Sequence, residues 1–113
     1  MGSFLPFSQF LWGLGFNAPE FSFSAGAVRH RTFPLIPVSV VVSTHGEIAL
    51  YSLVSAGHCL YLEDNESGGY GGTDGLLGAT PMQGLSVATG SVSARLCDAA
   101  APAPGLQWSA LTY

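Results

Sequence analysis

Apolar, β-branched residues dominate two short runs in the middle of the chain. The first run, VSVVVST, covers residues 38–44 and follows Pro34 and Pro37. The second run, IALYSLV, covers residues 48–54. Both runs are typical of β-strands, and the second, which is mostly apolar, predicts a strand that is buried on both faces or lies along a barrel wall. The sequence THGE between the two runs predicts a hairpin turn.

Polar residues and glycines break this pattern farther along the chain. The stretch SAGHC, residues 55–59, predicts the end of the second strand, and EDNESGGYGGTDG, residues 63–75, predicts a long polar loop. Apolar and polar residues then alternate in LSVATGSVSARLC, residues 85–97, which predicts one strand or a hairpin that turns at Thr89-Gly90. Since no stretch has the period of an amphipathic helix, the whole pattern predicts an all-β fold.

The two ends of the chain differ from its middle. The proline- and alanine-rich residues 98–105 predict a linker, and LQWSALTY, residues 106–113, predicts a final strand. Residues 1–32 are aromatic and poorly periodic, so we expect a lead-in followed by a single β-rich domain or half-domain at residues 33–113. Within the lead-in, residues 4–16 are typical of a leader or of a segment that packs on a core, and their aromatic content is also compatible with contact at a membrane interface.

The chain is short and poor in charge. It has 113 residues, of which 48% are hydrophobic and 9% are charged, and its formal net charge is −4. The only Lys or Arg residues are Arg29, Arg31 and Arg95. So few basic residues cannot form the basic surface that nucleic-acid binding requires. The share of hydrophobic residues is too high for a disordered chain.

His58 stands in the stretch VSAGHC, residues 54–59. A histidine takes and returns a proton near neutral pH, so it serves as a general base in acyl transfer. That chemistry also needs a hydroxyl or thiol nucleophile, a carboxylate that orients the ring, and backbone donors for the oxyanion. The small residues Ala56 and Gly57 leave room for the ring to reach a cleft.

VSAGHC resembles the histidine box of the chymotrypsin-like serine proteases. The longer stretch HCLYLEDNESGGY is similar to the bacterial glutamyl-endopeptidase branch, and the resemblance covers roughly residues 33–80. It implies the N-terminal half of a chymotrypsin-like antiparallel β-barrel; the alternative architecture is a small β-sandwich or barrel. Together with a leader at the N-terminus, it implies a secreted or extracytoplasmic protein.

Carried over to this sequence, the resemblance makes His58 the general base and Asp98 the carboxylate that orients it. Asp98 lies at about the family's distance after the histidine, whereas Asp74 falls in a glycine-rich loop. The family's Gly-Asp-Ser-Gly-Gly nucleophile sequence is absent, and Ser67 is too close to His58 along the chain to replace it. We therefore expect no hydrolysis by this chain alone.

The cysteines leave two alternatives open. In the family, the cysteine of the box usually pairs with one on the preceding strand, and this sequence has none there. Cys59 is then either a thiol or the partner of Cys97. Because a disulfide needs α-carbons within about 7 Å, a Cys59–Cys97 bridge would bring His58 and Asp98 into one neighbourhood.

These residues support hypotheses from different classes. The first is a truncated or degenerate relative of a serine endopeptidase, acting on a peptide or protein through an acyl-enzyme. The second is a small non-catalytic β-rich structural or protein-binding module, which we expect to be an oligomer. A third, a translated frame without a selected function, predicts a molten or aggregated product. His45, Glu47 and His58 have the chemistry of zinc ligands, but their spacing matches no metal signature, so we expect no metal and no cofactor.

Overall fold

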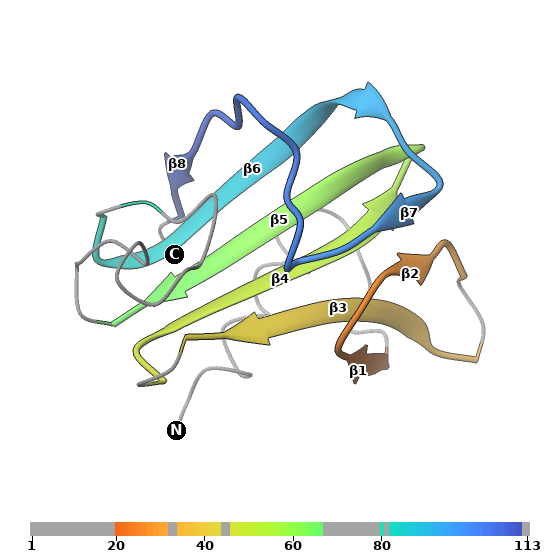
Figure 1. Ribbon diagram of the computed structural model, residues 1–113, viewed down its shortest axis with the longest axis horizontal. Coiled ribbons are helices and arrows are strands. Elements are labelled where there is room, and N and C mark those ends of the chain that lie inside the picture. Colours follow the sequence, from red (N-terminus) through yellow and green to blue (C-terminus); the bar gives the residue numbers. More distant parts are fainter. Residues whose placement is uncertain (1–19, 32–33, 44–45, 67–79, 81, 112–113) are drawn as a thin grey trace.

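A computed structural model describes residues 20–31, 34–43, 46–66, 80 and 82–111 of the chain. These residues contain strands and no helix, which confirms the all-β prediction. The strands are β1 (Phe21–Ser24), β2 (Val28–Arg29), β3 (Ile36–Val42), β4 (Ile48–Ser55), β5 (His58–Asn65), β6 (Gly84–Ser93), β7 (Leu96–Cys97) and β8 (Ser109–Ala110). Six of them form one sheet in the order β1-β3-β4-β5-β6-β8, and β2 and β7 form a second, two-stranded sheet (Figure 1).

The centre of the large sheet is a long hairpin of β4 and β5. Its two strands pair antiparallel along their whole length, from Ile48 opposite Asn65 to Ser55 opposite His58. The connection is the two-residue turn Ala56-Gly57, whose φ angles are +52° and +78°. Positive φ at both central residues is typical of the turn that matches the twist of a tight hairpin. The predicted break at SAGHC is therefore this turn.

One sequence-based boundary was wrong. Residues 63–65 were expected in the polar loop, but they form the last part of β5. Their pairing with β4 outweighs the local preference of polar residues for a loop. Of the two alternatives for residues 85–97, the strand without a hairpin turn is the correct one, because β6 runs through Thr89-Gly90 and has a bulge opposite Cys59.

The described part of the predicted lead-in takes part in both sheets. β1 pairs with β3, from Phe21 opposite Ile36 to Ser24 opposite Ser39, and this pairing is parallel. β2 pairs with β7. The large sheet is therefore mixed rather than purely antiparallel, and it does not close into a barrel. The predicted leader or membrane contact at residues 4–16 lies outside the described residues.

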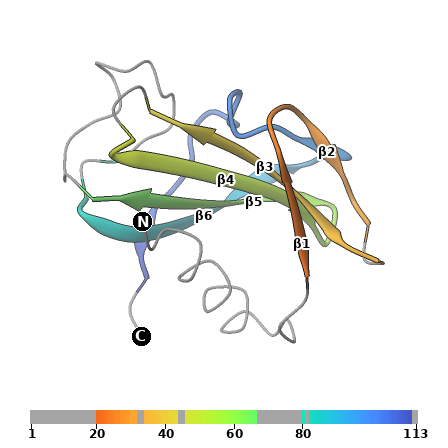
Figure 2. The same cartoon turned by 90° about the horizontal axis from the view of Figure 1, so that it is seen from below.

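The two faces of the large sheet are packed differently. One face carries an apolar cluster centred on Tyr51, Leu53 and Leu62. The other face is covered by the chain between β7 and β8, which crosses the front of the sheet in Figure 1 and lies along one side of it in Figure 2. The predicted linker at residues 98–105 thus packs on the sheet. Within the described ranges, no helix is long and apolar enough to span a membrane.

Candidate functional site

His58 is the first residue of β5, directly after the Ala56-Gly57 turn. It is half-buried and lies opposite Ser55 of β4 and Ser93 of β6. Its Nδ1 atom is buried and has no hydrogen-bond partner within the described part of the chain. The orienting partner that a general base needs at this nitrogen is therefore not in place.

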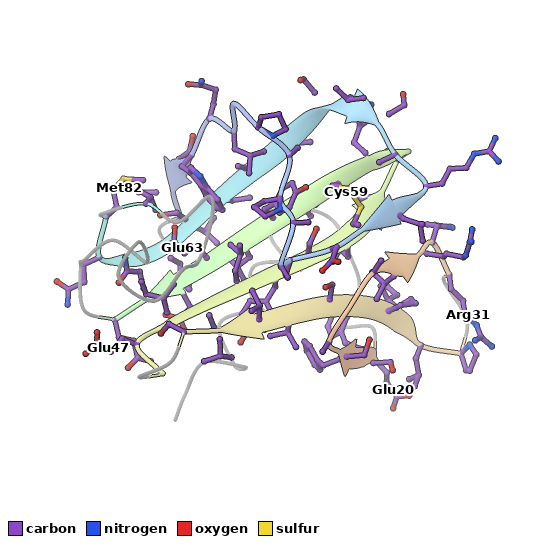
Figure 3. The ribbon with its side chains drawn as sticks, viewed as in Figure 1. Glu20, Arg31, Glu47, Cys59, Glu63 and Met82 are labelled. Atoms are coloured by element: carbon purple, nitrogen blue, oxygen red, sulfur yellow. A yellow bond between two sulfur atoms is a disulfide. The ribbon has the colours of Figure 1, made fainter. Side chains whose placement is uncertain are left out.

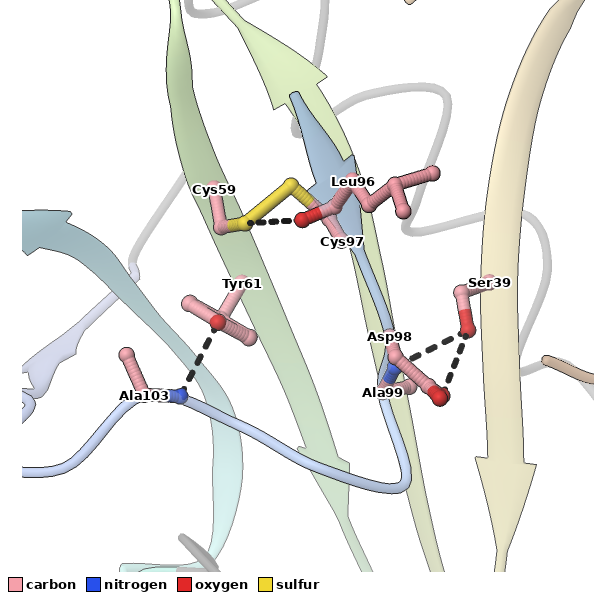
Figure 4. Close-up of a disulfide and its surroundings, with 8 residues drawn as sticks. All are labelled: Ser39, Cys59, Tyr61, Leu96, Cys97, Asp98, Ala99 and Ala103. Atoms are coloured by element: carbon pink, nitrogen blue, oxygen red, sulfur yellow. Dashed lines mark hydrogen bonds between the residues drawn. A yellow bond between two sulfur atoms is a disulfide. The ribbon is translucent and has the colours of Figure 1, made fainter. Parts of the chain in front are cut away.

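Asp98 follows β7 and is half-buried. Its Oδ1 atom accepts a hydrogen bond from the Ala100 backbone N–H at 3.0 Å and a longer one from the Ser39 hydroxyl at 3.5 Å. Ser39 Oγ in turn accepts the Ala99 backbone N–H at 2.9 Å, as Figure 4 shows. The Asp98 carboxylate thus fastens its own turn to β3, which is a structural task for an aspartate at this position.

The structure brings the two cysteines together. Cys59 and Cys97 form a disulfide with a Cα–Cα distance of 5.5 Å, which settles the alternative that the sequence left open (Figure 4). Cys59 Sγ also lies 3.4 Å from the Leu96 carbonyl oxygen, but a sulfur in a disulfide has no proton to donate, so this is a packing contact.

The disulfide does not create a His58–Asp98 pair. Neighbouring residues on a strand point to opposite faces, and Cys59 points to the face on which Cys97 lies. The His58 side chain is therefore directed away from that face. Among the described residues no hydrogen bond or ion pair joins His58 to Asp98. Their catalytic roles remain predictions.

An apolar cavity lies above the disulfide. Its volume is about 350 Å³, and Cys59, Tyr61, Val92 and Leu96 are among its lining residues. The Tyr61 hydroxyl accepts the Ala103 backbone N–H at 3.0 Å, which holds the covering chain against the sheet. Val92 and Leu96 are 71% and 47% exposed, so the cavity opens to solvent beside two large apolar side chains.

The outer edge of β6 runs along this cavity. In the described part of the chain β8 pairs with β6 at Ser86 and Val87, and the Leu111 N–H donates to the Leu85 carbonyl, while β5 occupies the inner side of β6. In the described ranges no strand covers the outer edge from Thr89 to Ser93, and Figure 1 shows that part of β6 at the border of the sheet. No sequence pattern indicated a role for this edge, although Val92 is an apolar residue between two exposed serines.

Glu63 is a second feature that the sequence did not indicate. It is 0% exposed, and burial raises the pKa of its carboxyl group from 4.5 to about 7, although the Thr80 backbone N–H donates to it and acts in the opposite direction. A buried carboxyl group with a raised pKa is a feature of many active sites. Glu63 does not line the cavity above the disulfide, so we assign it a structural role.

Other residues considered from the sequence are not placed. His45, Ser67 and Asp74 lie outside the described residues. The described residues contain no group of three or more His, Cys, Asp or Glu side chains that could hold a metal ion. No protein-family model matches the chain, and the searches of curated proteins and of solved structures give no match either.

Proposed function

We propose that this chain is a small non-catalytic binding module that accepts an extended segment of a partner protein along the outer edge of β6. The observation that carries the proposal is the uncovered edge from Thr89 to Ser93 beside the apolar cavity above the disulfide. In strand addition, main-chain hydrogen bonds supply affinity and a pocket for alternate side chains supplies selectivity.

The edge has the properties that strand addition needs. Sheet edges that must stay unpaired usually carry lysine, proline or inward-pointing charge, and residues 89–93 contain none of these. Thr89, Ser91, Val92 and Ser93 are exposed, so a partner strand meets no side chain packed over them. An apolar side chain of that strand would enter the cavity between Val92 and Leu96, whose lining includes the disulfide-bonded Cys59.

Selection from a random-peptide phage library on the folded, oxidised chain tests the proposal. We expect the selected peptides to slow amide hydrogen exchange in residues 89–93. The variant Val92→Glu should abolish their binding, because it places a charge at the mouth of an apolar cavity. Val42→Glu is the matched control, since Val42 is also exposed, at 49%, but lies on β3.

Two results would contradict strand addition. One is equal binding of the selected peptides to Val92→Glu and to the wild type. The other is exchange protection at residues 89–93 that depends on protein concentration without any peptide, because the occupant of the edge would then be a second copy of this chain.

A second candidate is the protease-like function that the histidine box implies. The Cys59–Cys97 bridge favours it, because the bridge joins the immediate neighbours of His58 and Asp98. For this function the Asp98 carboxylate would have to leave Ser39 and the Ala100 amide and approach Nδ1 of His58. The second candidate thus requires a rearrangement, whereas strand addition uses the geometry as it stands.

A further inference from the structure

Two of the chain's three arginines line one cavity at the turn end of the β4–β5 hairpin. The cavity has a volume of about 520 Å³ and is lined by Arg29, His30 and Arg95 together with small apolar residues. No aspartate or glutamate is among its described lining residues. This is unexpected in a chain with a formal net charge of −4, since each cation has an excess of carboxylates with which to pair.

Two exposed acidic residues lie at the far end of the hairpin from this cavity. Glu47 and Glu66 flank the open end of the β4–β5 hairpin, where the Glu66 backbone N–H bonds to the Glu47 carbonyl. Figure 3 shows Glu47 and the labelled Arg31 at opposite ends of the sheet. Arg29 and Arg95 have no ion pair within the described ranges. Their charges are therefore available to a ligand.

The backbone positions from which the cationic side chains extend are fixed by hydrogen bonds and by the disulfide. Arg29 on β2 pairs with Leu96 on β7, and Leu96 is the residue that follows Arg95. The Ala94 backbone N–H donates to the Gly57 carbonyl at 2.7 Å, which ties the bend before Arg95 to the hairpin turn. Since the disulfide fixes β7 to β5, the three segments that form the cavity are fastened to one another before any ligand binds.

The floor of the cavity has a different character. Val54, Ala56, Gly57 and Ala94 contribute apolar surface to it. A volume of about 520 Å³ falls in the range of small-molecule sites and exceeds what a simple inorganic ion fills. Guanidinium groups bind carboxylate and phosphate groups through two parallel hydrogen bonds. The lining thus matches a ligand with an anionic head and an apolar body.

We propose that the cavity formed by Arg29, His30, Arg95 and the hairpin turn is a binding site for a small organic anion, with a carboxylate or phosphate head on a compact apolar body. The site is separate from the outer edge of β6 and does not rest on the function proposed for that edge. The head lies between the two guanidinium groups, and the body lies on Val54 and Ala94.

Titration of benzoate and of phenyl phosphate into the oxidised chain, followed by backbone amide NMR, tests this site. We expect saturable shifts of the Gly57 and Ala94 amide signals with at least one of the two probes, which also identifies the preferred head group. Benzamide has the same ring without the charge and should cause no saturable shift. Inorganic phosphate should bind at least about tenfold more weakly than the probe that binds, because it leaves the apolar floor uncovered.

The three arginines provide matched variants. Arg29→Gln and Arg95→Gln should each weaken binding of the same probe about tenfold, the loss expected for one hydrogen-bonded charge. Arg31→Gln removes the same charge from the chain, but Arg31 does not line the cavity. The affinity of this variant for the probe should therefore stay within about twofold of the wild type. Arg29, Arg31 and Arg95 are all exposed, which favours folding of every variant.

Several results would overturn the proposal. If neither probe shifts the Gly57 and Ala94 signals, there is no site. Equal losses in Arg31→Gln and Arg95→Gln would show attraction to net charge without a defined cavity. If benzamide or inorganic phosphate binds as well as the charged aromatic probes, the pairing of an anionic head with an apolar body is wrong.

Discussion

Thr80 donates its backbone N–H to both carboxylate oxygens of Glu63, at 2.9 and 3.1 Å. Glu63 lies on β5 and has no exposed surface. Asn65, two residues farther along β5, donates its side-chain amide to the Thr80 carbonyl at 2.8 Å. Together, Glu63 and Asn65 bind the backbone of residue 80 to the end of β5. A buried carboxylate with one donor among the described residues is costly to ionise, which accounts for the raised pKa of Glu63.

Stability should therefore fall as the pH rises. The pKa of Glu63 is about 7 in the folded chain against 4.5 ordinarily, so its contribution is complete below about pH 4.5 and is lost as the pH passes 7. The loss is about 3 kcal/mol in the free energy of unfolding. Burial also raises the pKa of Asp64, which adds to the loss in the same direction. Urea unfolding at a series of pH values measures it.

Glu63→Gln separates this contribution from the others. Glutamine keeps an oxygen for the Thr80 N–H but does not ionise, so most of the pH dependence between pH 4.5 and 7 should disappear. Glu47→Gln, at an exposed position, should leave the dependence unchanged. An unaltered slope in Glu63→Gln would mean that Glu63 is not the group that titrates.

The Ala56-Gly57 turn makes a paired prediction. Ala56 has a positive φ, which alanine adopts at a cost and asparagine tolerates better, so Ala56→Asn should stabilise the chain by about 0.5–1 kcal/mol. A Cβ at Gly57 meets no atom within 4 Å, yet its φ of +78° makes Gly57→Ala destabilising by about 1 kcal/mol. Thermal unfolding of both variants checks the signs, and effects of equal sign would contradict this turn conformation.

The disulfide should contribute strongly to stability. It joins residues separated by 38 positions, for which the chain-entropy model gives about 4 kcal/mol. A reductant should lower the urea midpoint of the wild type by a corresponding amount. The double variant Cys59→Ala/Cys97→Ala should start at the lower midpoint and show no response to reductant, which controls for any other effect of the reagent.

Ser39 tests the structural role of Asp98. Ser39→Ala removes the acceptor of the buried Ala99 N–H and should cost about 1–2 kcal/mol, whereas Ser91→Ala at the exposed edge should cost little. In Asp98→Asn, which retains Oδ1, the imidazole NMR signals of His58 should not move. Displaced His58 signals would favour the protease-like candidate instead.

The central strands were predictable because their composition and their turn agree. β3 and β4 follow from β-branched, apolar runs. β5 could have been extended through Asn65, since a two-residue turn obliges eight residues after it to face the eight of β4. Because Glu63 and Asn65 are polar, the sequence pattern predicted that they are exposed in a loop, and the end of β5 was missed.

The candidate sites were less accessible from the sequence. The bulge in β6 could be suspected, because the apolar positions change phase between Val87 and Val92. The parallel pairing of β1 with β3 and the meeting of Arg29 with Arg95 depend on contacts between distant segments, which no local pattern encodes. Spacing offered the Cys59–Cys97 bridge as one alternative, but it could not tell to which faces His58 and Asp98 point.

The bridge also determines how the chain responds to tension. Cys59 and Cys97 enclose most of β5 and all of β6, while β1, β3 and β4 lie outside the closed loop. A pull on the two ends passes through the sulfur atoms and leaves the enclosed segment unstretched. The fully extended length of the oxidised chain should be about 130 Å less than that of the reduced chain. The disulfide prevents extension of 38 residue steps, each about 3.5 Å long. The pairing of β5 with β6 is thereby shielded from mechanical force.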